Sequence, residues 1–154
     1  MRRIDFIEYD EDFADEVFPF LENKKLHILD KYRIEEYSDL ILENHSHKLG
    51  RVQLSLTNLI LSKSDFVGLA ESDWINSIKE NLVKVALNHQ IMDLEFVLIG
   101  DNEIANSYYF LLKDFLEFFW SFFSIPQHTY LISKDGKYLF AYTFEDDLYF
   151  AQSN

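Results

Sequence analysis

The segment from Asn106 to Ile125, NSYYFLLKDFLEFFWSFFSI, is the most constraining feature of the sequence. Drawn as a helix at 100° per residue, its three charged residues, Lys113, Asp114 and Glu117, fall within one arc of about 100°. Aromatic or aliphatic side chains cover most of the remaining cylinder. A helix with this pattern is enclosed by protein and exposes one polar strip to water. We therefore predict a core helix over this segment.

Two other interpretations of this segment fit its residues less well. A membrane span needs about 18 or more apolar residues nearly free of charge, and each central charge would cost roughly 2.5–3.5 kcal/mol. An aromatic box around a flat cofactor is the other interpretation, but rings at helical spacing are more often packing groups. We expect neither a membrane span nor a cofactor.

Length and charge limit the remaining possibilities. A chain of 154 residues is expected to form a single domain, 1–154, and the absence of cysteine excludes disulfides and thiolate chemistry. The start, MRRIDFIEYDEDF, lacks the apolar core of a secretory signal, so we expect a cytoplasmic protein. The net charge of −13 repels nucleic acid and anionic membrane surfaces and favours a basic partner.

Acidic residues are concentrated near both ends of the sequence. Residues 1–23 contain eight acidic residues against two arginines, whereas residues 24–90 are balanced. Apolar residues spaced by three or four in the first segment predict a short helix from about Asp10 to Phe18, ended by Pro19. The simplest interpretation of these acids is a solvated face.

The middle of the chain alternates between strand-like and helix-like patterns. Leu26 and Ile28 predict a strand with His27 facing outward, and apolar residues spaced by four predict a helix over 72–86 behind a Ser or Asp cap. A further helix is expected from Ser38 to Gly50. Residues 51–63 favour a helix only weakly, and residues 92–99 fit either a strand or a helix.

The last thirty residues predict a three-stranded antiparallel meander. Asp135-Gly136 is a strong hairpin signal between 128–133 and 138–144, and a second turn at 145–147 leads into a closing strand. Alternation places the aromatic residues of the middle strand on one face, against the aromatic helix: Tyr138, Phe140, Tyr142 and Phe144. The predicted fold class is α+β, with helices packed on a small, mostly antiparallel sheet.

Catalytic and metal-binding motifs are not evident. No serine lies in a nucleophile motif, and the four glycines form no phosphate-binding loop. His45 and His47 are two residues apart and have no third ligand at a recognised spacing, so we predict no metal site. His89 and His128 are interpreted as hydrogen-bonded packing groups. We expect a protein that is not an enzyme.

The C-terminal third, FFWSFFSIPQHTYLISKDGKYLFAYTFEDDLYFA, resembles small acidic immunity proteins of bacterial contact-dependent growth inhibition and related polymorphic toxin systems. The likeness is one of layout: an aromatic helix ending in Ile-Pro-Gln-His, a short hairpin and an aromatic strand after an acidic turn. The resemblance implies a cytoplasmic, non-catalytic protein that binds one toxin domain, often a nuclease with a basic substrate groove. It identifies no contact residue.

Local charge alone suggests a partner-binding surface, because carboxylates beside aromatic side chains combine attraction for a basic partner with groups that can be desolvated. The predicted partner-binding residues are Glu8, Asp10, Glu11, Asp12, Asp15, Glu16, Glu145, Asp146, Asp147 and Tyr149. A small-molecule or peptide-binding regulatory domain and a divergent enzyme are the two alternatives. The sequence leaves the oligomeric state open.

Overall fold

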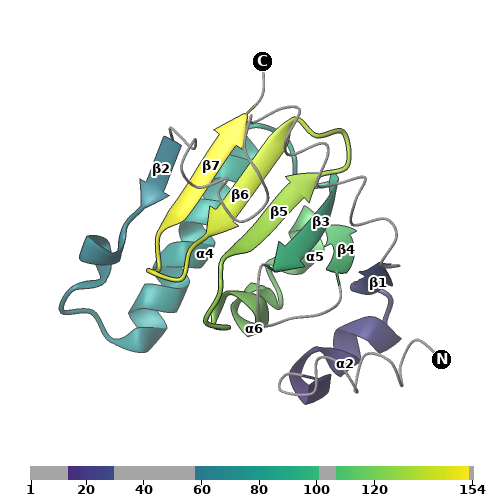
Figure 1. Cartoon of the computed structure of the whole chain (residues 1–154), viewed down its shortest axis with the longest axis horizontal. Helices are drawn as coiled ribbons and strands as arrows, with labels where there is room; N and C mark the ends of the chain where they lie inside the picture. The colour runs from purple at the N-terminus through teal and green to yellow at the C-terminus, as the bar shows by residue number, and fades with distance from the viewer. Residues whose placement is uncertain (1–13, 30–57, 101–106, 153–154) are drawn as a thin grey trace.

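The computed structural model describes residues 14–29, 58–100 and 107–152, and these form an α+β fold (Figure 1). The strands are β1 (His27–Leu29), β2 (Asn58–Leu61), β3 (Glu95–Gly100), β4 (Ser107–Leu111), β5 (Thr129–Ser133), β6 (Tyr138–Tyr142) and β7 (Leu148–Gln152). The helices are α2 (Ala14–Glu22), η3 (Lys63–Phe66, a 3₁₀ helix), α4 (Glu71–Asn88), α5 (Leu112–Phe115) and α6 (Phe119–Phe123).

The strands form one sheet in the order β1-β4-β3-β5-β6-β7-β2, and every neighbouring pair is antiparallel. The C-terminal meander β5–β6–β7 is confirmed, with Phe140 opposite Leu131 on one side and Phe150 on the other. Gly136 lies in the first turn at φ 76°. Only glycine adopts this left-handed conformation without steric cost, which explains why the Asp-Gly signal predicted the hairpin correctly.

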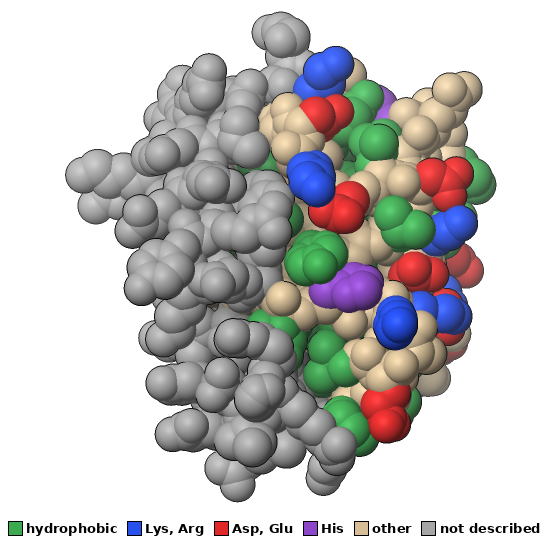
Figure 2. Space-filling view, turned by 90° about the vertical axis from the view of Figure 1, so that its right-hand side faces the viewer, with side chains coloured by type: hydrophobic (Ala, Val, Ile, Leu, Met, Phe, Trp, Pro, Cys, Tyr) green, Lys and Arg blue, Asp and Glu red, His purple; other side chains and the backbone are tan. Residues whose placement is uncertain are grey.

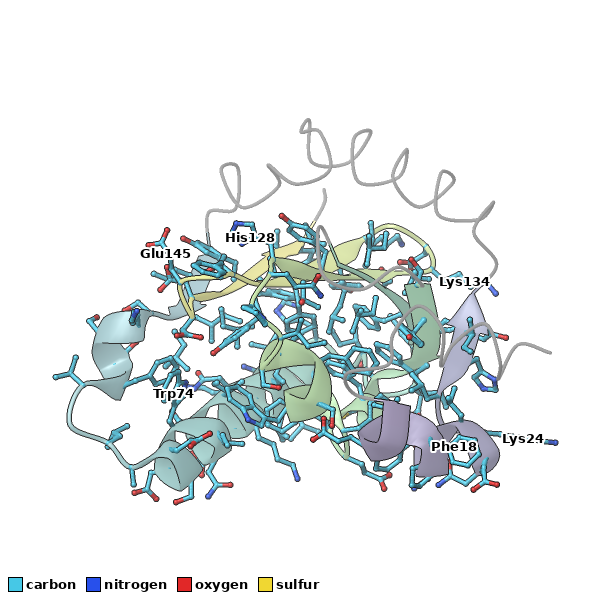
Figure 3. The ribbon with its side chains drawn as sticks, turned by 60° about the horizontal axis from the view of Figure 1, so that its bottom comes forward. Phe18, Lys24, Trp74, His128, Lys134 and Glu145 are labelled. Carbon is cyan, nitrogen blue, oxygen red and sulfur yellow. The ribbon has the colours of Figure 1, made fainter. Side chains whose placement is uncertain are left out.

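The described helices lie on one face of the sheet (Figure 3). The predicted helix over 72–86 is confirmed as α4, which buries Ile78, Leu82 and Ala86 at successive four-residue steps. Its start differs from the prediction. The helix begins after Ala70, and no side chain caps it.

The prediction of one helix over 106–125 is wrong at both its start and its centre. The first residues form strand β4, which lies between β1 and β3 in the sheet. Two short helices follow, and they are separated at Phe118, whose backbone (φ −136°, ψ 17°) is not helical. The polar strip was correctly placed, because Lys113 and Glu117 are exposed while Phe115 and Phe122 are buried.

The strand conformation of β4 has a physical cause. Aromatic side chains suit a strand that is covered on both faces. Tyr108 and Phe110 pack into the core beneath the helices, while Tyr109 packs on the opposite face of the sheet. With apolar residues on both faces, the sequence shows no alternation that would distinguish a strand from a buried helix.

Two further predictions are corrected. Pro19 lies inside α2 instead of ending a helix at Phe18, and α2 continues to Glu22. The weak preference for helix over 51–63 is wrong for β2, which pairs with β7. The open choice over 92–99 is resolved as strand β3 from Glu95. Residues 51–57 and the predicted helix from Ser38 to Gly50 lie outside the described residues.

The core is dominated by rings contributed by α5, α6 and the meander. Phe115 is fully buried and stacks on Phe110, with ring centroids 4.7 Å apart and an interplanar angle of 13°. Phe123 stacks on Tyr142 at 4.6 Å and 6°, which confirms the predicted contact between the aromatic segment and the meander. Phe144 departs from that prediction, because it lies beyond the end of β6 and is 61% exposed.

The opposite face of the sheet has its own buried cluster, which includes Val97, Tyr130, Ile132 and Leu139. Buried side chains on both faces explain why the central residues of β3 and β5 are apolar without alternation. Among the described residues, no helix is both long and apolar enough to cross a bilayer.

Candidate functional site

The N-terminal acids are only partly within the described chain. Glu8, Asp10, Glu11 and Asp12 lie outside the described residues. Asp15 belongs to α2, but its side chain is not described. Glu16 lies on α2 and is exposed.

The C-terminal acids occupy the β6–β7 turn, residues 143–147. Glu145 is exposed, and Asp146 and Asp147 are half-buried. Tyr149 follows on β7, where it is half-buried and packs against the outer cluster of the sheet. The pKa of Tyr149 is raised, mainly by partial burial and to a smaller extent by the charges of Asp147 and Glu145. The structure thus brings these four predicted residues together.

The two predicted acidic sets do not meet among the described residues. α2 leads into β1 at one edge of the sheet, and the β6–β7 turn is four to five strands away. Each strand spacing is roughly 4.8 Å. Figure 3 places the labelled Glu145 at one side of the molecule and Phe18 of α2 at the other. A partner contacting both sets would have to span the sheet.

Backbone hydrogen bonds hold the turn in a defined shape. Thr143 N–H donates to Asp147 O at 2.9 Å, and Asp146 N–H donates to Thr143 O at 2.9 Å. Asp146 has φ 65°, a left-handed conformation that Asp and Asn tolerate better than most residues. The Asp147 carboxylate accepts a hydrogen bond from Lys63 N–H at 2.9 Å, which ties the turn to η3.

Asp146 is also held through its side chain. The Tyr142 hydroxyl donates to Asp146 Oδ1 at 3.1 Å. Burial first, and then the charge of Asp146, raises the pKa of Tyr142 well above its ordinary value. The nearby Trp74 indole N–H lowers the pKa of Tyr142 by a smaller amount. This N–H is buried and is not placed to form a hydrogen bond with any described residue. The Tyr142 hydroxyl therefore remains neutral and can donate its hydrogen bond to the Asp146 carboxylate, which holds that carboxylate in place.

A pocket of about 300 Å³ opens beside this turn, where α4, α6 and the turn converge. Its walls include Glu71 and Trp74 from α4, Trp120 and Phe123 from α6, and Phe144 and Asp146 from the turn. Trp74 contacts Trp120 edge to face with centroids 6.2 Å apart, and Trp120 contacts Tyr142 at 6.3 Å. Both tryptophans of the chain therefore line one pocket, together with two carboxylates.

Charges elsewhere on the described chain are largely mixed or paired. Lys25 pairs with Glu117, Lys113 with Asp93, and Lys134 with Glu95. Figure 2 shows acidic and basic side chains interspersed on the described part of the β1 side. By contrast, Glu71, Glu145, Asp146 and Asp147 form no ion pair with any residue in the described ranges. The lining of this pocket thus contains two carboxylates and, within the described ranges, no basic residue.

Two other hollows offer less suitable chemistry. One, of about 410 Å³, lies between α2 and β1 and has Glu22 as its single lining carboxylate among the described residues. Its His27 ring stacks on Tyr109 at 4.7 Å. The other lies along α4 and includes Lys79 and Lys84. Neither combines aromatic walls with several acids.

The His128 side chain is hydrogen-bonded, whereas the His89 side chain makes ring contacts and no hydrogen bond with any described residue. His128 Nδ1 accepts a hydrogen bond from Phe144 N–H at 3.0 Å, and this bond supports the start of the turn. His89 contacts the rings of Tyr138 and Phe150. His45 and His47 lie outside the described residues. The described residues include no group of three or more side chains suited to hold a metal ion.

Sequence reasoning did not select the pocket residues contributed by the helices. Trp74 falls within the helix predicted over 72–86, and Trp120 falls among the aromatic residues of the core helix predicted over 106–125. They are 46 positions apart in the sequence, and only the packing of α4 against α6 brings them into contact. No local pattern marks such a pair. Glu71 was missed because the helix begins earlier than its predicted cap.

Comparison with protein-family models, curated proteins and solved structures finds no match for the chain.

Proposed function

We propose that the protein is an immunity protein that binds and neutralises a cognate bacterial toxin domain with a basic surface. Its acidic side chains would occupy a cationic groove of the toxin, standing in for the phosphates of a nuclease substrate. The resemblance of the C-terminal third to immunity proteins of contact-dependent growth inhibition supports this proposal. No catalytic step is required of such a protein.

The observation that carries the proposal is the composition of the β6–β7 turn. Three consecutive carboxylates, Glu145, Asp146 and Asp147, lie beside Phe144, whose side chain is 61% exposed. Unpaired carboxylates attract a basic partner and speed its association, while an exposed ring supplies apolar area that binding can bury.

The test is to look for a toxin gene immediately upstream and to measure association with its toxin domain by stopped flow at two ionic strengths. Glu145→Lys should slow association severalfold at low salt, and the difference should shrink at high salt because screening removes long-range attraction. Glu80→Lys is the matched control, since it reverses an exposed acid on α4 outside the pocket. Equal effects of the two changes would reject the turn as the binding surface.

The N-terminal acids provide a second comparison. Glu16→Lys on α2 changes the same charge at the far side of the sheet. If this change slows association and Glu145→Lys does not, the acidic surface of the first segment binds the toxin. If neither changes the rate, the electrostatic basis of the proposal is lost.

One alternative is favoured by a specific observation. The pocket between α6 and the meander turn has a volume within the range of small-ligand sites. A regulatory domain that binds a small molecule or peptide would use the same pocket. A thermal-shift screen that finds a stabilising metabolite, with no toxin gene upstream, would support this alternative over inhibition.

A further inference from the structure

The pocket beside the β6–β7 turn combines two features that attract cations. Its walls are aromatic, from Trp74, Trp120, Phe123 and Phe144, and its polar side chains include the carboxylates of Glu71 and Asp146. No basic residue lines it within the described part of the chain. Aromatic faces and carboxylates both attract cations, the first through the ring quadrupole and the second through charge.

The Asp146 carboxylate is oriented but not saturated. Its Oδ1 accepts the Tyr142 hydroxyl at 3.1 Å, whereas its Oδ2 accepts no hydrogen bond from any residue of the described ranges. The left-handed backbone and the bond of Asp146 N–H to Thr143 O hold this residue in the turn, and the Tyr142 hydroxyl orients its carboxylate. Glu71, in the first turn of α4, likewise has no ion-pair partner among the described residues. Two acceptors are thus available to an incoming cation.

We propose that this pocket binds the side chain of an arginine presented by the partner protein. The guanidinium lies against the aromatic walls and donates hydrogen bonds to Asp146 and Glu71. A planar guanidinium suits this setting better than an ammonium, because it stacks on rings and offers several donors in fixed directions. The inference rests on the proposed function, since the basic toxin supplies the arginine.

The test uses N-acetyl-L-arginine amide as the probe and N-acetyl-L-citrulline amide as its uncharged isostere. Both tryptophans line the pocket, so the two indole N–H signals in ¹H–¹⁵N spectra of the full chain report directly on the site. We expect the arginine compound to shift both signals saturably, with a dissociation constant on the order of millimolar for so small a ligand. The citrulline compound should bind about tenfold more weakly or not at all.

Two variants test the carboxylates separately. Asp146→Asn keeps an acceptor and a residue that tolerates the left-handed backbone, and Glu71→Gln leaves the turn untouched. Each should weaken binding of the arginine compound severalfold, whereas Glu80→Gln, an exposed α4 position outside the pocket, should not. Equal binding of arginine and citrulline compounds, full affinity in both pocket variants, or absence of any shift would overturn the inference.

The experiment separates this inference from the proposed function. If the arginine compound fails to bind while Glu145→Lys still slows association with the toxin, the turn binds its partner without an arginine pocket. If the compound binds but no upstream toxin domain is inhibited, the pocket stands and the immunity function fails.

Discussion

The Tyr142 hydroxyl donates a hydrogen bond to Asp146 Oδ1 at 3.1 Å, and this bond joins the end of β6 to the turn that carries the acidic residues. The ring of the same tyrosine stacks on Phe123 of α6 at 4.6 Å. One side chain thus connects the aromatic core to a carboxylate at the surface. The position of Asp146 beside the pocket therefore depends on core packing as well as on the turn.

Replacing Tyr142 with phenylalanine should alter how stability depends on pH. Burial and the Asp146 charge raise the pKa of Tyr142 in the folded protein, so the neutral hydroxyl is favoured there. Its contribution is fully present below the ordinary tyrosine pKa of about 10 and is lost as pH rises further, because the unfolded chain then releases the proton more readily.

Urea unfolding of wild type and Tyr142→Phe at pH 7 and at pH 11 checks this expectation. At pH 7 the variant should lose about 1 kcal/mol with the hydrogen bond. At pH 11 that deficit should narrow or reverse. Tyr130→Phe on β5 is a comparison from the opposite face of the sheet. A deficit that stays constant with pH would contradict the assignment.

Asp135 should stabilise the hairpin between β5 and β6 through its ionised carboxylate. Partial burial raises its pKa, but hydrogen bonds from Ser133 Oγ at 2.6 Å and Lys137 N–H at 3.0 Å outweigh burial and hold the pKa below its usual value. A lowered pKa means that the stabilisation is present above about pH 4 and is lost as pH falls.

Asp135→Ala should therefore reduce the unfolding free energy by about 1 kcal/mol at pH 7. The difference from wild type should shrink as pH falls below about 4, which chemical denaturation across this range would measure. Glu80→Ala, which changes an exposed acid on α4 that has no ion-pair partner among the described residues, serves as the control. A deficit that persists at low pH would show that the side chain acts by shape and not by charge.

The correctly predicted elements are those with a local physical signal. Asp135-Gly136 places a residue free to adopt positive φ between two alternating segments, and α4 repeats apolar residues every four positions through Ala86. The prediction of one helix over 106–125 failed because it depended on the angular positions of charged residues, and these all lie after Leu112. Before that position the segment has no charged residue to define a face, and pairing with β1 and β3 decided the conformation.

Only the part of the candidate site whose acidic residues are neighbours in the sequence could be predicted. Glu145, Asp146, Asp147 and Tyr149 are adjacent in sequence, so their proximity in the turn required no knowledge of the fold. The aromatic side of the pocket arises from contacts between α4 and α6, such as that of Trp74 with Trp120. Such contacts depend on how helices pack over the sheet, and neither composition nor periodicity determines that.

The backbone of Asp146 gives a prediction that separates conformation from charge. At φ 65°, alanine is disfavoured by roughly 1–2 kcal/mol, whereas asparagine and glycine are tolerated. Asp146→Ala should thus lower thermal stability more than Asp146→Asn or Asp146→Gly, as measured by calorimetry. Equal losses for alanine and glycine would indicate that the lost Tyr142 hydrogen bond dominates and that backbone strain is minor.

Replacing a buried phenylalanine should lower stability, whereas replacing an exposed one should mainly affect binding. Phe115 is fully buried among the rings of Phe110, Phe118 and Phe123, and its replacement with alanine should cost about 3–5 kcal/mol because a cavity remains. Phe144 is 61% exposed, so Phe144→Ala should change the unfolding free energy by less than about 0.5 kcal/mol. Urea unfolding measures both changes.

Binding should follow the reverse order for variants that remain folded. Phe144→Ala should weaken association with the toxin domain that the proposed function requires, because the ring beside the acidic turn is lost while the charges remain. Phe115→Leu, a milder core change, should leave affinity near the wild-type value once the protein is folded, since the residue does not reach the surface. Titration calorimetry with the toxin domain gives both affinities. Unchanged affinity for Phe144→Ala would mean that the exposed ring is not a contact.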